Sequence, residues 1–188
     1  MHDTQILPEA TNGIDLPALG RMIEAINKDP AEARVEFRVR TGWTGGTRSE
    51  TAVESYVLGG ETIARRFKIV ADEPVELCGR NTAPNPQELL MASVNACMTV
   101  GYVANAALRG VKLTALEIEM SGELDLRGFL GLDDTVPPGY REIDYIVRMQ
   151  GDGSAAQYAE IHGAVMRTSP NFFNMARAIC MNGRLEAF

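Results

Sequence analysis

The chain has 188 residues, of which 45% are hydrophobic, and a formal net charge of −7 at pH 7. This length and apolar fraction fit one domain, or one domain plus a short extension, that can bury a real hydrophobic core. The negative charge argues against nucleic acid and anionic membrane surfaces as partners, because both attract basic proteins.

Cysteine and histidine usage restricts the chemistry further. The three cysteines have no CxxC spacing, and such an odd, unclustered set is typical of a reducing compartment; they are Cys78, Cys97 and Cys180. The two histidines, His2 and His162, leave almost no material for a Cys/His zinc site. Residues 1–5 show neither a basic nor an apolar region of a signal peptide. We therefore expect a cytoplasmic protein without a metal or cofactor.

Residues 1–33 are predicted to form an N-terminal extension with one short helix. Asp15 followed by Leu16-Pro17 can begin an amphipathic helix that runs to about residue 27, and Asp29-Pro30 would end it.

The next part of the chain has the pattern of β-structure. Apolar and charged residues alternate over residues 35–40, which predicts a half-buried strand, and the glycines between residues 42 and 46 are expected to end it. Two further strands are predicted over residues 51–58 and 62–70, joined by a turn at Gly59-Gly60. Together these segments predict an antiparallel β-meander.

A long uncharged helix is predicted after a polar loop. Residues 89–108 contain no Asp, Glu, Lys or Arg, and Asn85, Pro86 and Glu88 form a capping-box-like beginning. Gly110 can end the helix in the left-handed conformation. The stretch is long enough to cross a bilayer, but its Ser, Asn, Thr and Gly residues favour a buried central helix, so no membrane span is expected.

The C-terminal part is predicted to alternate strands and helices. Alternating patterns predict strands near residues 116–121 and 143–149, separated by a Gly/Pro-rich loop. Ser154 with Gln157 predicts a capped helix, Ser169-Pro170 begins another, and a short terminal strand near residues 184–188 is possible. The order of elements predicts an α+β fold in which helices cover an antiparallel sheet.

The run Asn-Pro-Gln-Glu-Leu-Leu-Met-Ala-Ser-Val-Asn-Ala-Cys at residues 85–97 resembles the signature of the OsmC-like family. That family includes osmotically inducible protein C and the organic hydroperoxide resistance proteins. The resemblance covers residues 34–188, as an OsmC-like domain, and implies an intertwined homodimer of α+β subunits with a reactive cysteine near the interface. The activity it implies is thiol-dependent reduction of organic hydroperoxides.

The resemblance implies roles for individual residues, and two positions depart from it. Cys97 falls on the peroxidatic cysteine of the family. The second, resolving cysteine of the family precedes a proline late in the chain, where this sequence has Ser169. A serine cannot form a disulfide, so the next thiol would be Cys78, Cys180 or an external reductant.

The charged partners of the thiol are also carried over from the resemblance. The family's glutamate position holds Gln87 here, with Glu88 next to it, and Glu88 has an alternative role as a helix cap. The family's activating arginine corresponds to Arg48, one residue out of step, with Arg40 as the alternative. A thiol about three turns into a helix gains little from the helix dipole, so Cys97 needs such a cation to be reactive and would otherwise be an inert core residue.

Several apolar side chains could line a pocket over Cys97, although many such residues are plain core. They are Trp43, Met91, Met98, Tyr102, Phe172 and Phe173. The sequence thus predicts a thiol peroxidase acting on a small apolar hydroperoxide with an external thiol reductant. The alternative is a non-catalytic module of the same fold that binds an apolar small molecule.

Overall fold

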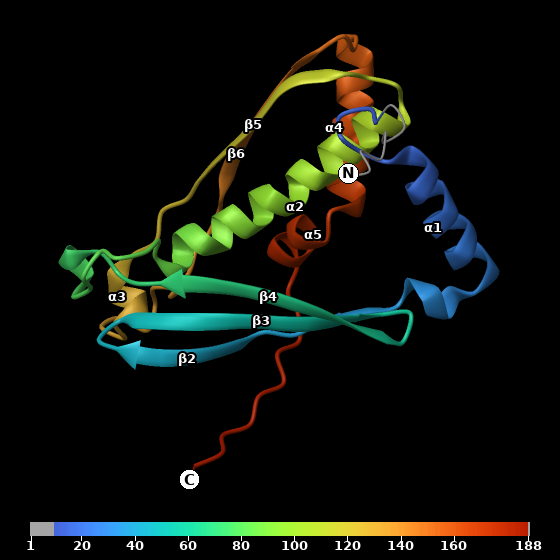
Figure 1. Ribbon diagram of the computed structural model, residues 1–188. Coiled ribbons are helices and arrows are strands. Elements are labelled where there is room, and N and C mark those ends of the chain that lie inside the picture. The colour runs from blue at the N-terminus through green and yellow to red at the C-terminus, as the bar shows by residue number, and fades with distance from the viewer. Residues whose placement is uncertain (1–9, 188) are drawn as a thin grey trace, which may run out of the picture. The chain divides into compact units, whose positions relative to one another are not determined.

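The computed structural model describes residues 10–187 (Figure 1). The chain forms two compact units, Met1–Leu90 and Met91–Phe188. Each unit is described separately below. The domain boundary expected at residue 33 stays a prediction.

The first unit begins with the expected helix, α1 (Leu16–Lys28), followed by a 3-10 turn at Pro30–Ala33. The Asp15 carboxylate accepts a hydrogen bond from the Ala18 N–H at 2.9 Å, which caps α1. The helix predicted in the N-terminal extension is therefore confirmed.

An antiparallel sheet makes up the rest of the first unit. Its strands are β1 (Val35–Phe37), β2 (Arg40–Gly45), β3 (Arg48–Leu58) and β4 (Glu61–Ala71). Both β1 and β2 pair with β3, at its two ends, and β4 also pairs with β3, so the predicted meander is confirmed (Figure 1).

The predicted end of the first strand was wrong. Gly42 lies inside β2 and pairs with Glu50, whereas the break falls at residues 38–39, between β1 and β2. The ladder to β3 continues through a glycine because cross-strand hydrogen bonds use only the backbone.

The central helix α2 (Pro86–Leu108) has the predicted ends. The Glu88 N–H donates to Asn85 Oδ1 and the Asn85 N–H donates to Glu88 Oε2, both at 2.8 Å, which is a reciprocal capping box. Gly110 follows with a φ of +69°, the left-handed conformation expected of a helix stop.

The second unit contains a two-stranded ribbon and three further helices. The ribbon pairs β5 (Leu113–Ser121) with β6 (Asp144–Gly151), and the segment between them contains a short helix, α3 (Leu126–Phe129). Helices α4 (Ala155–Thr168) and α5 (Pro170–Ala176) follow, and α4 begins with the predicted Ser154–Gln157 capping box. Residues 177–187 form neither helix nor strand, so the possible terminal strand is absent over 184–187, and Phe188 lies outside the described residues.

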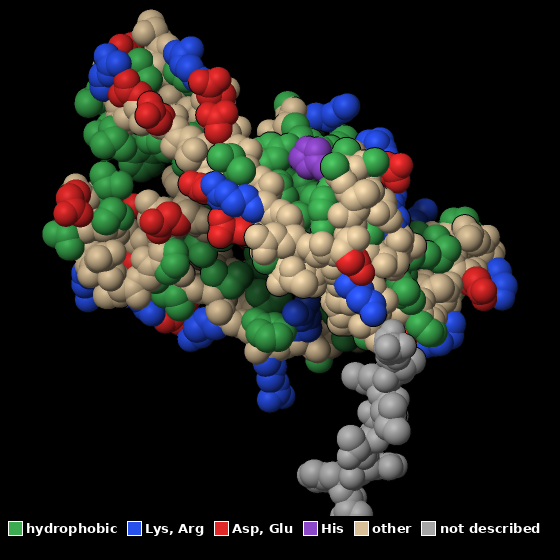
Figure 2. Space-filling model, turned by 90° about the horizontal axis from the view of Figure 1, so that it is seen from above, with side chains coloured by type: hydrophobic (Ala, Val, Ile, Leu, Met, Phe, Trp, Pro, Cys, Tyr) green, Lys and Arg blue, Asp and Glu red, His purple; other side chains and the backbone are tan. Residues whose placement is uncertain are grey.

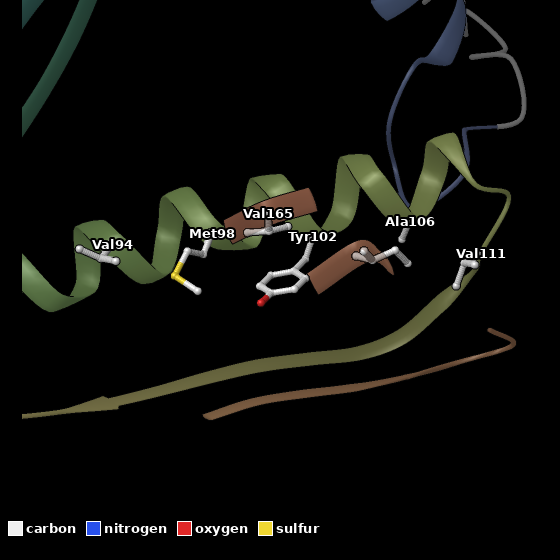
Figure 3. Packing of buried hydrophobic residues seen from close by; sticks show 7 residues of the cluster. Val94, Met98, Tyr102, Ala106, Val111 and Val165 are labelled. Carbon is white, nitrogen blue, oxygen red and sulfur yellow. The ribbon is translucent and has the colours of Figure 1, made fainter. Parts of the chain in front are cut away.

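The core of the second unit follows one side of α2. Val94, Met98, Tyr102 and Ala106 recur every four residues and point the same way, toward β5 and α4 (Figure 3). Val111, Ile161 and Val165 complete the buried cluster, and side chains of the β5–β6 ribbon pack against it.

This buried row bears on the membrane question. By length and composition α2 could cross a bilayer, with a mean hydropathy of 1.3, but a core helix passes the same test. A row of fully buried side chains in contact with α4 and the ribbon favours a core helix.

Candidate functional site

Cys97 lies on α2 beside the buried row, one residue before Met98. Its side chain is half-buried, whereas Cys78 and Cys180 are exposed, and none of the three forms a disulfide. A partly accessible thiol can meet a small molecule, which a fully buried one cannot.

The nearest polar partner of this thiol is Ser169. The Ser169 hydroxyl donates a hydrogen bond to Cys97 Sγ, with an O–S distance of 3.4 Å. Ser169 is only 4% exposed, so water competes little for this contact. The structure therefore brings Cys97 together with Ser169, the residue that the resemblance predicts at the position of the second cysteine.

Two more contacts hold α2 against the junction of α4 and α5. The Asn171 side-chain amide donates to the Ser93 carbonyl at 2.9 Å, one turn before Cys97. One turn after Cys97, a Cβ placed on Gly101 would lie 3.3 Å from both methyl groups of Val165. Positions 93, 97 and 101 of α2 thus face positions 171, 169 and 165, and the missing side chain of Gly101 permits the close approach.

The apolar residues expected over Cys97 have different surroundings. Met98 is fully buried in the core, and Phe172 packs on that core with its ring edge against Tyr145. Phe173 is largely exposed, and the Arg177 guanidinium lies 5.1 Å from its ring centroid. Met91 is half-buried on the first turns of α2. Met98 is accordingly a packing residue, while Phe173 supplies accessible apolar surface on α5.

The expected arginines belong to the sheet of the first unit. Arg48 is paired with Glu50 at 2.8 Å, and Arg40 with Glu54 at 2.9 Å. The hydrogen bonds of Lys68 and Arg48 hold the pKa of Glu50 below its usual value. Both arginines are therefore paired with carboxylates of their own sheet, and Arg48 shares Glu50 with Lys68.

The register of the sheet separates the arginines from Trp43. Arg40 lies opposite Ala52, so it shares a face with residue 48, whereas Trp43 lies opposite Ser49 on the other face. Trp43 is 78% exposed, and its indole N–H donates to the Gly46 carbonyl. One face of this sheet cannot present both Trp43 and these arginines, and their catalytic and substrate-binding roles stay predictions.

Glu88 is engaged at the beginning of α2. Its carboxylate accepts the Asn85 N–H in the capping box, the alternative role considered for it from the sequence. A role of Glu88 at the thiol stays a prediction.

Sequence reasoning missed a buried carboxylate in the first unit. Asp72 is 1% exposed, and its oxygens accept hydrogen bonds from the hydroxyls of Thr47 and Thr82, both at 2.7 Å. The backbone N–H groups of Glu73, Arg80 and Thr82 donate to it as well. These donors hold the pKa of Asp72 well below its usual value. Asp72 thereby fixes the loop before α2. Thr47 is 25 positions away from Asp72, so no local sequence pattern could predict their contact.

A second buried polar contact lies in the core of the second unit. The Tyr102 hydroxyl lies 2.6 Å from His162 Nδ1, and their rings are stacked. Burial raises the pKa of Tyr102 to about 12. His162 thus serves as a hydrogen-bond partner for a buried tyrosine.

Other chemistries find little support in the described residues. Among residues 10–187, no group of three or more His, Cys, Asp or Glu side chains could hold a metal ion. A cavity of about 990 Å³ is formed by the connection between β5 and β6, with lining residues from Ser121 to Asp144. Cys97 does not line this cavity, and the charged walls carry both signs.

Comparison with known proteins agrees with the architecture. The family model described as OsmC-like protein matches residues 79–182, more than half of the chain. The chain therefore belongs to the OsmC-like family. No curated protein sequence matches it.

Solved structures support the fold. An OsmC-like protein of Mycoplasma pneumoniae is similar with a TM-score of 0.59 and 14% identity, over 75% of this chain and 87% of that one. A Psychrobacter arcticus protein gives 0.55 and 15%, over 72% and 85%. An OsmC-like protein of unknown function from Vibrio cholerae gives 0.54 and 11%, over 73% and 92%. At these identities the likeness concerns the fold alone.

Proposed function

We propose that this protein is a cytoplasmic thiol peroxidase that reduces organic hydroperoxides through Cys97. The observation that carries the proposal is the half-buried Cys97 thiol, held beside the Ser169 hydroxyl on the central helix of an OsmC-like chain. Phe173 lies on α5, the helix that Ser169 caps. Its exposed ring offers an apolar surface to the alkyl or aryl group of the hydroperoxide.

The reaction follows from the chemistry of one thiol. The Cys97 thiolate attacks the distal oxygen of the hydroperoxide, the O–O bond breaks, and the alkoxide takes up a proton and leaves as an alcohol. The sulfur is oxidised to a sulfenic acid. Because Ser169 cannot resolve it, an external thiol attacks the sulfenic sulfur and water leaves; a second external thiol then restores Cys97 and releases the external disulfide.

An arginine would stabilise the thiolate and the departing oxyanion, and Arg48 is our first candidate, with Arg40 as the second. Arg48 is the more buried of the two, with its side chain 31% exposed against 77% for Arg40. A neutral isostere separates them: Arg48→Met should slow oxidation of Cys97, while Arg40→Met should leave the rate unchanged. Equal rates in wild type and both variants would exclude both arginines.

The peroxidase proposal is tested by intact mass after a brief, near-stoichiometric pulse of cumene hydroperoxide with a sulfenic-acid trap. One added oxygen or one trap adduct, formed within seconds and absent in Cys97→Ser, is the expected result. A loss of two hydrogens would instead show a disulfide with Cys78 or Cys180 and would contradict the one-cysteine cycle. No change over many minutes would contradict the peroxidase and favour a ligand-binding module.

We further propose that the active form is a homodimer in which a second copy covers apolar side chains of the first unit. Trp43 is 78% exposed and Phe67 58%, and their β3 partners Ser49 and Val53 place both rings on one face of the sheet. Figure 2 shows hydrophobic side chains open at the surface of the face drawn there. Exposed apolar surface of this kind marks interaction sites in folded proteins.

The homodimer is tested by native mass spectrometry and light scattering. Wild type should be a dimer at micromolar concentration, and Phe67→Glu should shift it toward monomer. Arg66→Glu, a charge change at the neighbouring exposed position of the same strand, is the matched control and should leave the dimer intact. A monomeric wild type over the whole concentration range would contradict the proposal.

A further inference from the structure

Ser169 is held in place by both helices that meet at it. Its backbone N–H donates to the Val165 carbonyl at 2.8 Å, at the end of α4. Its side chain caps α5, since the hydroxyl oxygen accepts the Phe172 N–H at 3.4 Å. A residue that ends one helix and begins the next has little freedom to turn away from α2.

The hydrogen bonds at Ser169 also determine where its proton points. Because the hydroxyl oxygen accepts the Phe172 N–H, its own O–H is directed at another acceptor, which is Cys97 Sγ at 3.4 Å. Ser169 is 4% exposed, so the donor is shielded from water. A shielded donor aimed at sulfur stabilises the thiolate relative to the neutral thiol, because hydrogen bonds to a charged acceptor are the stronger ones.

Packing around the contact fixes its geometry. Val165, one turn before Ser169, lies so close to Gly101, one turn after Cys97, that an added Cβ there would be 3.3 Å from both its methyl groups. Asn171 bonds to the Ser93 carbonyl one turn before Cys97. The Cys97–Ser169 contact thus lies between two other contacts of the same helices, which limit how far the two helices can separate at it.

We propose that Ser169 is a catalytic residue, which stabilises the Cys97 thiolate by donating its hydroxyl proton to Sγ in a hydrogen bond. This inference rests on the proposed function of Cys97, but it concerns the state of the thiol before any peroxide arrives. A serine at this position cannot form a disulfide with Cys97, but its hydroxyl can stabilise the Cys97 thiolate.

The test is the pH–rate profile of Cys97 alkylation by iodoacetamide, measured by intact mass on the full chain with Cys78→Ser and Cys180→Ser. Only thiolate reacts, so the midpoint of the profile reports how readily Cys97 ionises. Ser169→Ala should move the midpoint to higher pH by about half to one unit, which slows alkylation at pH 7 by about threefold to tenfold. Ser169→Thr, which keeps the hydroxyl, should restore the wild-type profile.

Two further variants separate the hydroxyl from the helix cap. Ser169→Gly removes the donor but is tolerated better than Ala at an N-cap, and it should shift the profile as Ser169→Ala does. Ser154→Ala removes the matched cap of α4 without touching Cys97 and should leave the profile unchanged. If the Ser169→Ala and Ser169→Gly profiles superimpose on that of wild type, the inference fails.

The alkylation profile needs no hydroperoxide, so the two proposals fail separately. A shifted profile together with an inert thiol in the peroxide pulse would retain the role of Ser169 and remove the peroxidase. Rapid oxidation together with an unshifted profile would retain the peroxidase and remove the role of Ser169.

Discussion

The sheet of the first unit and the helix–ribbon core of the second unit differ in what they bury. In the described residues, every buried hydrophobic side chain lies between Val94 and Val165, in the second unit. The first unit buries a carboxylate instead, that of Asp72, and keeps rings such as Trp43 exposed. Apolar burial is the main favourable term in folding, so we expect the core of the second unit to contribute more to stability than the sheet of the first unit.

The largest expected effect breaks the core of the second unit. Met98→Ala removes a fully buried side chain from the row on α2 and should lower the free energy of unfolding by about 2–5 kcal/mol. Phe67→Ala, at a 58% exposed position of the first unit, is the matched comparison and should cost much less at the monomer level. Both are measured by urea denaturation. A loss of unfolding free energy in Phe67→Ala that grows with protein concentration would show that a second copy covers Phe67. Equal losses in Met98→Ala and Phe67→Ala at every concentration would contradict the contrast between the units.

A smaller effect acts on the same core through pH. The pKa of Tyr102 is raised from 10.0 to about 12 by burial, so above pH 10 the unfolded chain loses the phenolic proton while the folded chain keeps it. Stability should therefore fall as pH rises from 10 to 12, by about 2–3 kcal/mol in total from this group. Denaturation curves of wild type and Tyr102→Phe measure it: the variant should lose less stability over this range, and parallel losses would show that Tyr102 is not responsible.

The smallest expected effect is local and belongs to the first unit. Asp72→Asn removes the charge that accepts hydrogen bonds from the loop before α2, so the amides of Arg80 and Thr82 should exchange faster with solvent. Because the pKa of Asp72 is depressed in the folded chain, its contribution to stability is present above its unfolded value of 3.8 and is lost as pH falls below it. At pH 3 the folded chain still holds Asp72 ionised, so both amides should still exchange more slowly in wild type than in the variant. Unchanged exchange at both amides in Asp72→Asn would contradict the role of this carboxylate.

Local patterns predicted the ends of the elements well. The capping residues Asp15, Asn85 and Ser154 all act as the sequence indicates, because a cap involves neighbours within three positions. The meander followed from alternation and a Gly-Gly turn. The strand break near Gly42 was mispredicted, since pairing with β3 outweighs the weak strand preference of glycine.

Contacts between distant positions could not be predicted in the same way. Cys97 and Ser169 are 72 positions apart, and the resemblance to a family suggested that both matter without indicating that one donates to the other. The buried face of α2 was hidden because the helix is apolar nearly all round, so no periodicity marked it. Asp72 lies in a stretch with the composition of an ordinary polar loop. Its structural role depends on the hydroxyls of Thr47 and Thr82 that donate to it, which the local sequence does not indicate.

The absent side chain at Gly101 has a consequence for how this protein can change over time. A methyl group there would press on Val165 at 3.3 Å, and Val165 lies one turn from Ser169. Growth at position 101 would therefore have to be matched by shrinkage at position 165, or the distance between sulfur and hydroxyl would widen. The volume of residue 101 thus limits which sequences can keep the contact between Cys97 and Ser169, and positions 101 and 165 should vary together.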